Sequence, residues 1–363
     1  MSNDEASRVV VALDRARLQA GRELRGKSQI ALGRDAGVTA AAISQFENGH
    51  SRPMPATLNK IASALDLPVG YFARRPGTGA HAPAAFFRSL RSTTAGERRR
   101  AVALAGLVHE LVHAIEDHVD LPPVDLPEAA PAHDDRAVDA AAADAREHLG
   151  LNPHDPIEDV VRVLERHGAV TARFRVDADK MDAFSVLYPD RPVVVLGSDK
   201  GYRDRSRFDA AHELAHLLLH GPDDAGTKKA EQQAHRFAAA FLMPEHAIIN
   251  ELPRKANWNQ LMALKQKWQV SLAALLKRAQ TLGVMDDHDY TQAMKTMSAR
   301  RWRNPEPGDL GQPERPLVLA AAIRVAEDNG VTLDKLAEQH GLPIHDLRSI
   351  LRPSLDPRPR VRI

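Results

Sequence analysis

Two histidines four residues apart, with a glutamate directly after the first, occur in the segment Phe208-Asp-Ala-Ala-His-Glu-Leu-Ala-His216. On an α-helix, His212 and His216 lie one turn apart on the same face. Two neutral imidazoles at this spacing can hold one Zn²⁺, and Glu213 can take a proton from an attacking water. The surrounding apolar residues indicate a buried helix, on which inward polar side chains need partners. The pattern therefore predicts a zinc site with Glu213 as the general base.

The HExxH pattern occurs a second time, nearer the N-terminus, as His109-Glu-Leu-Val-His113. This copy lies in an expected helix over residues 95–119, which begins with a basic run and is followed by a Pro-rich segment. No helix close to it in the sequence offers a third ligand, and the metzincin extension is absent. We interpret this copy as an amphipathic linker helix with solvated His and Glu side chains, and we place the metal at the copy around Glu213.

A helix expected just downstream of Glu213 supplies the third ligand. Glu231 and His235 stand four residues apart on it, and either a carboxylate or an imidazole can complete a three-residue zinc site with one position left for water. Residue types and spacing leave both open. His220, at the end of the apolar run, is expected at the surface.

Length and composition indicate a globular protein of two or three domains, since the chain has 363 residues of which 43% are hydrophobic. We see no apolar stretch of membrane-spanning length and no signal peptide in the polar start. The absence of cysteine excludes disulfides and thiolate ligands, so a reducing cytoplasm is the expected location. Residues 1–100 contain 16 Lys and Arg against 8 Asp and Glu, an excess that favours nucleic-acid binding at this end.

The N-terminal part is expected to contain two short helices joined by a glycine turn. Ser28 and Thr39 are suited to cap the two helices, and Gly37 between them permits a left-handed turn. Ile30 and Leu32 are expected to point inward. The expected helices of this five-helix unit include residues 9–26, 28–36, 40–47 and 58–67. A helix pair of this kind is a helix-turn-helix.

These residues, together with Gly26-Lys-Ser-Gln-Ile-Ala-Leu and Pro53, resemble the Cro and lambda-repressor (XRE) type of DNA-binding domain over about residues 9–73. The resemblance implies DNA contacts by Gln29, Thr39, Ala40, Ala41, Ser44, Gln45 and Arg52. Gln29 would contact a phosphate. Alanine can offer only a methyl group to thymine, so we expect Gln45 to carry most of the base readout. Binding as a dimer to an inverted repeat is expected, and a protein-interaction module without DNA binding is the alternative.

The body of the chain follows a Gly/Pro-rich boundary after Arg74. Hydrophobic periodicity and terminating glycines predict helices over residues 134–149 and 156–167 and then three short strands. The expected strands cover residues 170–176, 182–187 and 193–196. The helix that carries His212 follows them.

This order of elements, with Met181-Asp-Ala-Phe-Ser185 and Phe237-Ala-Ala-Ala-Phe-Leu-Met-Pro244, resembles the ImmA/IrrE family of zinc metallopeptidases over about residues 134–285. The family places an acidic residue just before its Ala…Phe-Ala pattern, which favours Glu231 over His235 as the third ligand. The resemblance implies a gluzincin-like endopeptidase that cleaves a protein, typically a repressor or antitoxin encoded nearby, in phage, mobile-element, toxin–antitoxin or stress control.

We therefore expect a multidomain, mainly α fold with a small β-sheet, in which an all-α helix-turn-helix domain joins an α+β zincin-like domain. The expected divisions are residues 8–74 for DNA binding, 75–133 for a linker with a long helix, 134–285 for the peptidase and 286–363 for a C-terminal helical region. The expected function is a DNA-binding, Zn²⁺-dependent endopeptidase that regulates transcription. The alternative is a regulator whose peptidase-like domain is a non-catalytic sensor or docking module.

Overall fold

The computed structural model describes residues 3–73, 84–87, 94–128, 131–174, 183–197, 202–303 and 305–355. The expected Gly/Pro-rich boundary after Arg74 lies outside these residues. Within the described part, the fold is mainly helical with one small sheet, as predicted. None of the helices described there is long and apolar enough to cross a membrane.

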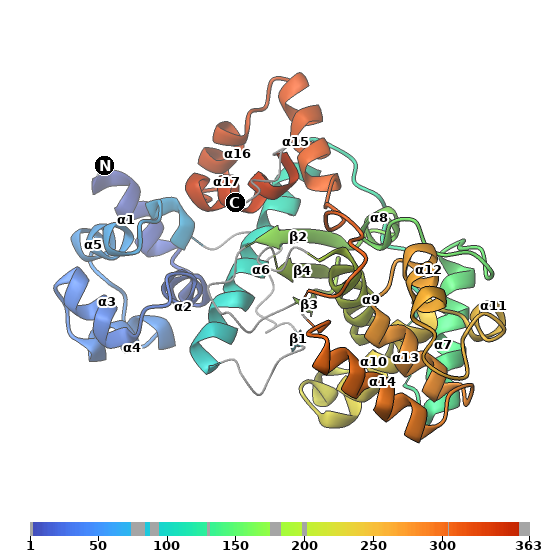
Figure 1. Ribbon diagram of the computed structural model, residues 1–363. Helices are drawn as coiled ribbons and strands as arrows, with labels where there is room; N and C mark the ends of the chain where they lie inside the picture. Colours follow the sequence, from blue (N-terminus) through green and yellow to red (C-terminus); the bar gives the residue numbers. More distant parts are fainter. Residues whose placement is uncertain are drawn as a thin grey trace.

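The N-terminal domain is a compact set of short helices (Figure 1). Its elements are α1 (Asn3–Val11), α2 (Arg15–Leu24), α3 (Gln29–Ala36), α4 (Ala40–Asn48), α5 (Pro55–Leu65) and the 3-10 helix η1 (Val69–Phe72). The predicted single helix over residues 9–26 is wrong. The helix is interrupted at Asp14. The Asp14 side chain caps α2 by accepting from the backbone N–H of Ala16, and the Asp14 backbone N–H donates to the carbonyl of Phe72.

The caps of the two central helices agree with the sequence prediction. The Ser28 hydroxyl accepts from Ala31 N–H, the Thr39 hydroxyl accepts from Ala42 N–H, and Gly37 between them is left-handed at φ 68°. Leu32 is buried, but Ile30 is 74% exposed, so its predicted inward orientation is wrong. Ile30 is the second residue of α3, and in this first turn of the helix its side chain faces solvent.

A four-stranded mixed sheet stands at the centre of the molecule. Its strands are β1 (Ala84–Phe87), β2 (Val170–Phe174), β3 (Ala183–Leu187) and β4 (Val193–Gly197), in the order β1-β3-β4-β2. β3 pairs antiparallel with β1 and β4, whereas β2 pairs parallel with β4. Three of these strands match the predicted ones, and β1 is a strand that the sequence analysis did not predict.

The strand β4 is buried on both faces and separates two hydrophobic cores. Val193 and Val195 belong to one core, and Val194 and Leu196 to the other. This division follows from the strand period of two, by which successive side chains point to opposite faces. The sheet is therefore the boundary between two halves of the molecule.

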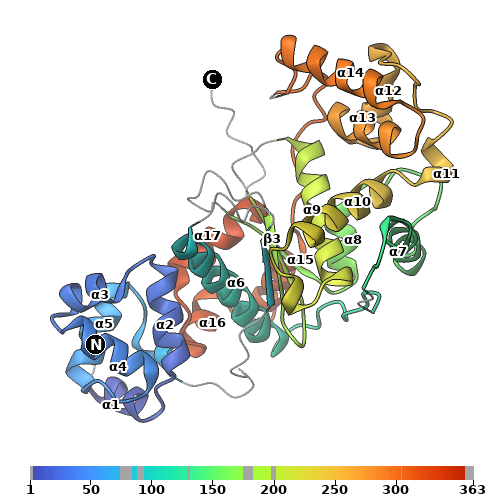
Figure 2. The same cartoon turned by 90° about the horizontal axis from the view of Figure 1, so that it is seen from below.

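The first half joins the N-terminal domain to one face of the sheet. Its further helices are α6 (Ala95–Glu116), α15 (Val318–Asp328), α16 (Leu333–Gln339) and α17 (Ile344–Leu355). Figures 1 and 2 show α6 lying between α2 and the sheet, with α15 and α17 beside it. The prediction that α6 is an amphipathic linker helix with solvated His and Glu is wrong, because α6 packs against α2, β4, α15 and α17 and buries residues such as Val108 and Leu111.

The second half covers the other face of the sheet. Its helices are α7 (Asp135–His148), α8 (Val160–Arg166), α9 (Arg203–Leu219), α10 (Lys228–Leu242), α11 (Glu245–Ile248), α12 (Trp258–Trp268), α13 (Leu272–Thr281) and α14 (Asp287–Ala299), with the 3-10 helix η2 (Pro222–Asp224) between α9 and α10. α9 packs against β3, β4, α8 and α10, so the helix that carries His212 has neighbours on all sides.

A buried ion pair anchors the start of α9. The guanidinium of Arg207, which is fully buried, donates to Glu314 and to the backbone carbonyls of Ile157 and Glu158. Glu314 also accepts from the backbone N–H groups of Val160 and Val161 at the start of α8. Glu314 follows α14 in the chain, so a segment near the C-terminus completes the interior of this half.

Candidate metal centre

His212 and His216 face each other on the buried side of α9. Both residues are 0% exposed, and their Nε2 atoms lie 3.1 Å apart. The helix runs through apolar neighbours on every side, which holds both imidazoles in fixed positions. The predicted placement of the pair on one helix face agrees with this geometry.

Glu231 reaches the same point from α10. Its carboxylate oxygens lie 3.5 Å from His212 Nε2 and 3.4 Å from His216 Nε2. Burial would raise the pKa of the Glu231 carboxyl, but the hydrogen bonds and charges of the two histidines outweigh burial and lower that pKa to about 2. The group is therefore a carboxylate at neutral pH, the form in which it can bind a metal.

The structure brings His212, His216 and Glu231 together, with one ligand atom of each within 4.8 Å of the others. His235, the alternative third ligand, stands beside this group: its ring centroid lies 4.7 Å from that of His212, and its side chain is exposed. The geometry favours Glu231, and the identity of the third ligand stays a prediction.

Glu213 is held by a contact that the sequence analysis missed. The side chain is fully buried, and the hydroxyl of Ser185 on β3 donates to Glu213 Oε2 at 2.7 Å. Ser185 lies on a strand, where it is one of few polar residues in a buried run. The available sequence signal was a lone hydroxyl in the otherwise apolar segment Ala183–Leu187.

His220 is buried rather than at the surface, so that prediction is wrong. It is 3% exposed, because it closes the end of α9 against α10. Its Nδ1 lies 3.0 Å from His216 Nδ1, and its Nε2 lies 3.2 Å from the amide oxygen of Gln233. The Gln233 amide in turn donates to the carbonyl of Ala132. Burial, followed by the neighbouring His216, lowers the pKa of His220 to about 4.

These contacts assign the tautomers of both histidines. The Ala132 carbonyl only accepts, so Gln233 donates to it and presents its oxygen to His220 Nε2–H. Neutral His220 then has an unprotonated Nδ1, which accepts from His216 Nδ1–H. His216 Nε2 faces His212 and the Glu231 carboxylate, and this nitrogen would give up its proton on binding a metal. A histidine whose other nitrogen donates to a second group is the usual arrangement at a metal.

The donor set fits zinc. Ligands about 2.0–2.1 Å from a tetrahedral Zn²⁺ are separated from one another by about 3.3 Å, and the three distances here are 3.1, 3.4 and 3.5 Å. Two imidazole nitrogens and one carboxylate leave a fourth position, as in catalytic zinc sites.

A cleft of about 1500 Å³ opens beside this group. Phe208 and His235 line it, and the ring contact between His235 and His212 connects the cleft to the buried histidines. Basic side chains are frequent on its walls, although Arg236 is paired with Asp135 and Asp139. The cleft offers space for a segment of polypeptide beside Phe208 and His235.

The first HExxH copy lies on α6, at the other side of the sheet. The carboxylate of Glu110 forms a bidentate pair with Arg17 of α2, at 2.5 and 2.9 Å. His109 is partly buried, and burial lowers its pKa against the raising effect of Asp190. A carboxylate does lie near its two histidines, namely Asp190 from the β3–β4 turn. We expected no helix close in the sequence to supply a third ligand to this copy. The third group, a carboxylate, comes instead from Asp190, in the turn between β3 and β4.

The predicted DNA-contacting residues gather at α3 and α4. Ala41 and Gln45 are exposed, and Ala40 and Ser44 are partly so, which leaves this face of α4 accessible. Thr39 caps α4, and Arg52 is exposed with its guanidinium donating to the Val11 carbonyl at 3.1 Å.

Glu47 and Gln29 form a small network behind this face. Glu47 is buried in a bidentate pair with Arg22, consistent with a structural role, and it also accepts from the Gln29 amide at 2.8 Å. Gln29 is thus positioned by Glu47, and its expected phosphate contact stays a prediction. Close packing of α3 on α4 needs Gly33, since a Cβ there would lie 2.9 Å from the Val38 carbonyl oxygen.

Comparison with known families gives two matches. Residues 164–280 match the peptidase family M78, described as the IrrE N-terminal-like domain. Residues 18–72 match a family described as helix-turn-helix. No curated protein matches the chain. The two matches confirm the suspected architecture, in which an XRE-type helix-turn-helix domain precedes an IrrE/ImmA-like domain.

The chain thus combines the features of a DNA-binding regulator with a metallopeptidase-like domain. Within the described residues, the candidate centre of that domain is the group formed by His212, His216 and Glu231, with Glu213 beside it.

Proposed function

We propose that this protein is a zinc-dependent endopeptidase, linked to a DNA-binding domain, that regulates transcription by cleaving a partner protein. The observation that carries the proposal is the convergence of His212, His216 and Glu231 at mutual distances of 3.1–3.5 Å. Glu213 on the same helix supplies a carboxylate held by Ser185.

Zinc held by these three side chains would supply Lewis acidity toward the scissile carbonyl and the attacking water. Glu213 acts as the general base: its carboxylate takes a proton from the water and then passes the proton to the leaving amine. Ser185 positions the carboxylate by donating its hydroxyl to Glu213 Oε2 at 2.7 Å. His220 holds His216 in the tautomer whose Nε2 can bind the metal.

The substrate class follows from the family likeness and from the cleft. IrrE/ImmA-like peptidases suggest a repressor or antitoxin encoded nearby, and the cleft beside His235 has room for an extended segment of such a protein. The helix-turn-helix domain would hold the enzyme near the operator at which that repressor acts.

Cleavage is tested by incubating the full chain with the repressor encoded next to it, with and without a chelator. We expect a defined pair of fragments that disappears when zinc is removed and returns when zinc is restored. If the repressor stays intact while it still binds the protein, the IrrE-like domain is a non-catalytic sensor or docking module.

Operator binding is tested separately with duplex DNA at several salt concentrations. The exposed face of α4 should give affinity that falls as salt rises. Gln45→Ala should relax base preference at one position by about 1–3 kcal/mol, whereas Arg52→Ala should weaken all sequences alike if Arg52 contacts phosphate. Binding that is insensitive to sequence in both the parent and Gln45→Ala would leave only a non-specific role for this face.

A further inference from the structure

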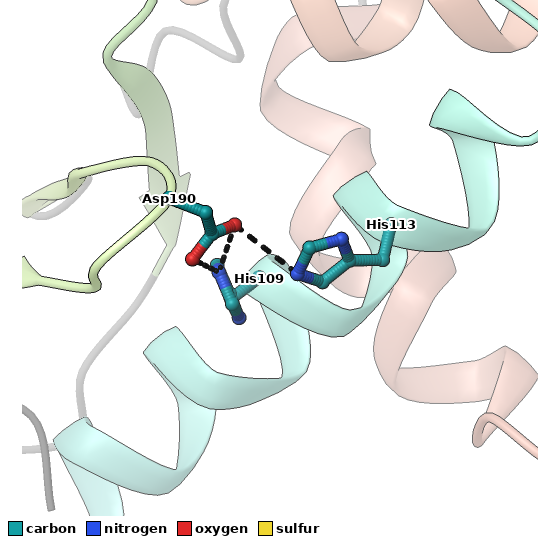
Figure 3. Close-up of side chains that lie close together, drawn as sticks. All are labelled: His109, His113 and Asp190. Carbon is teal, nitrogen blue, oxygen red and sulfur yellow. Dashed lines mark hydrogen bonds and ion pairs between the residues drawn. The ribbon is translucent and has the colours of Figure 1, made fainter. Parts of the chain in front are cut away.

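The first HExxH copy forms a second group of potential ligands, built from parts of the chain far apart in sequence. His109 and His113 lie on α6, and Asp190 lies in the turn between β3 and β4 (Figure 3). His109 Nε2 is 2.9 Å from each oxygen of Asp190, and His113 Nε2 is 3.2 Å from Asp190 Oδ2. Each imidazole therefore directs its own Nε2 atom at the Asp190 carboxylate.

The arrangement has the composition and size of a metal site. Two imidazole nitrogens and a carboxylate suit divalent transition metals, and one ligand atom of each residue lies within 4.8 Å of the others. The nitrogen–oxygen distances of 2.9 and 3.2 Å are close to the separation of about 3.3 Å between ligands of a tetrahedral ion. Small side-chain rotations would accommodate the ion.

Neighbouring residues hold these side chains in place. The ring of Tyr188 stacks on that of His109 with centroids 3.9 Å apart. Glu116 Oε2 lies 3.5 Å from His113 Nδ1, so the nitrogen opposite the ligand position faces a carboxylate, as is usual for metal-binding histidines. Arg191, next to Asp190, fixes the turn by donating to Glu116 and to the carbonyls of Pro122 and Gly168.

The site is open to solvent, unlike the one around His212. The side chains of His113 and Asp190 are 45% and 42% exposed, whereas that of His109 is 13% exposed. An ion can therefore enter directly and keep water as further ligands. Glu110, the residue that would be the base in this copy, is engaged by Arg17, so this site lacks the catalytic carboxylate.

We propose that His109, His113 and Asp190 bind a divalent transition-metal ion at a second, non-catalytic site that fastens the β3–β4 turn to α6. The site lies between the helix that contacts the DNA-binding domain and the strands of the sheet. α6 holds the DNA-binding domain through the pair Glu110–Arg17, and β3 carries Ser185, which contacts Glu213. Occupancy of the site restrains the two elements that link the halves of the molecule. This proposal does not depend on whether the protein is a peptidase.

The test counts Zn²⁺ equivalents bound to the full chain by equilibrium dialysis after metal removal. His113→Ala and Asp190→Asn should each bind one equivalent fewer than the parent, and both positions are exposed enough for the fold to tolerate the change. Glu231→Ala, which acts on the other group, should leave this equivalent in place. If both His113→Ala and Asp190→Asn bind as many equivalents as the parent, the proposal is wrong.

Two further variants separate a built site from adventitious binding to surface histidine. His118→Ala removes an exposed imidazole just beyond α6 and should leave the count unchanged. Glu116→Gln should keep the count but weaken the second equivalent roughly 10-fold, as expected for a group behind a ligand. Equal losses in His113→Ala and His118→Ala would indicate adventitious binding and would overturn the proposal.

A measurement on the parent alone guards against unfolding of the variants. Zn²⁺ should slow chemical modification of His113 by diethyl pyrocarbonate at least several-fold, while His118 in the same sample reacts at an unchanged rate. Equal rates at His113 with and without Zn²⁺ would contradict the proposed site.

Discussion

The two HExxH copies share a pattern and differ in what surrounds their glutamates. Both lie on helices, and both receive a carboxylate from another element, Glu231 at one and Asp190 at the other. Glu213 is fully buried and accepts from the neutral hydroxyl of Ser185. Glu110 is bound on both oxygens by the guanidinium of Arg17.

The motif therefore specifies where two imidazoles lie, whereas the partner of the glutamate determines what its carboxylate can do. A carboxylate that accepts from a neutral hydroxyl, as Glu213 does, can still take up a proton as a general base. A carboxylate bound at both oxygens by arginine instead joins two helices. The first copy is thus suited to fastening the DNA-binding domain to the sheet, and the second to catalysis.

The largest expected effect is that of Glu213→Gln on proteolysis. The amide keeps the size of the side chain and loses its basicity, so the cleavage rate should fall about 10²- to 10⁴-fold while zinc stays bound. Cleavage rate and metal content are measured on the same preparation.

The matched control is Glu110→Gln in the other copy. It should leave the cleavage rate within about 2-fold of the parent, because Glu110 lies on the far side of the sheet. It should lower the free energy of unfolding by about 1–3 kcal/mol, because the ion pair with Arg17 is lost. If Glu110→Gln lowered the cleavage rate as much as Glu213→Gln, the two HExxH copies would not differ in the way stated above.

An intermediate effect is expected at the third ligand. Substitutions behind a metal ligand weaken metal binding about 10- to 100-fold. Glu231→Ala, which removes the proposed ligand itself, should therefore lower the affinity of this centre for zinc by at least roughly 100-fold. His235→Ala, one turn along α10, should retain the parental affinity. Competition with a chelator measures both, and the reverse ranking would make His235 the ligand.

The smallest effect is expected for Ser185→Ala. Loss of a hydrogen bond to a charged group corresponds to roughly a 10-fold decrease in kcat, because Glu213 is then less well positioned. Zinc affinity and KM should stay unchanged. A variant with parental kcat would mean that the Ser185 contact does not distinguish the two glutamates.

Features set by local sequence could be predicted. Ser28, Thr39 and Gly37 define helix ends through contacts within a few residues, and the spacing of His212 and His216 fixes their relation on any helix. The strands β2, β3 and β4 were also recognisable in the sequence from their apolar, β-branched composition.

Features set by distant contacts could not be predicted. β1 is a short apolar segment whose strand form depends on pairing with β3, whose paired residues lie 97–103 positions further along the chain. The burial of α6 depends on α2, on the sheet and on helices near the C-terminus. Ser185, His220 and Asp190 gained their positions only when separate elements met, so residue type alone gave no reason to assign them to the sites.

The ion pair between Arg207 and Glu314 also bears on the timing of biosynthesis. Glu314 is made 107 residues after Arg207, which corresponds to roughly 5–20 s at typical rates of translation. During that interval the buried guanidinium at the start of α9 lacks its carboxylate, and α8 lacks the side chain that accepts from its first N–H groups. The helix carrying His212 and Glu213 is therefore secured only after the other elements of its half have left the ribosome. The candidate metal centre is therefore completed late in the synthesis of the chain, and nascent chains that end before Glu314 should be more sensitive to added protease than chains that include it.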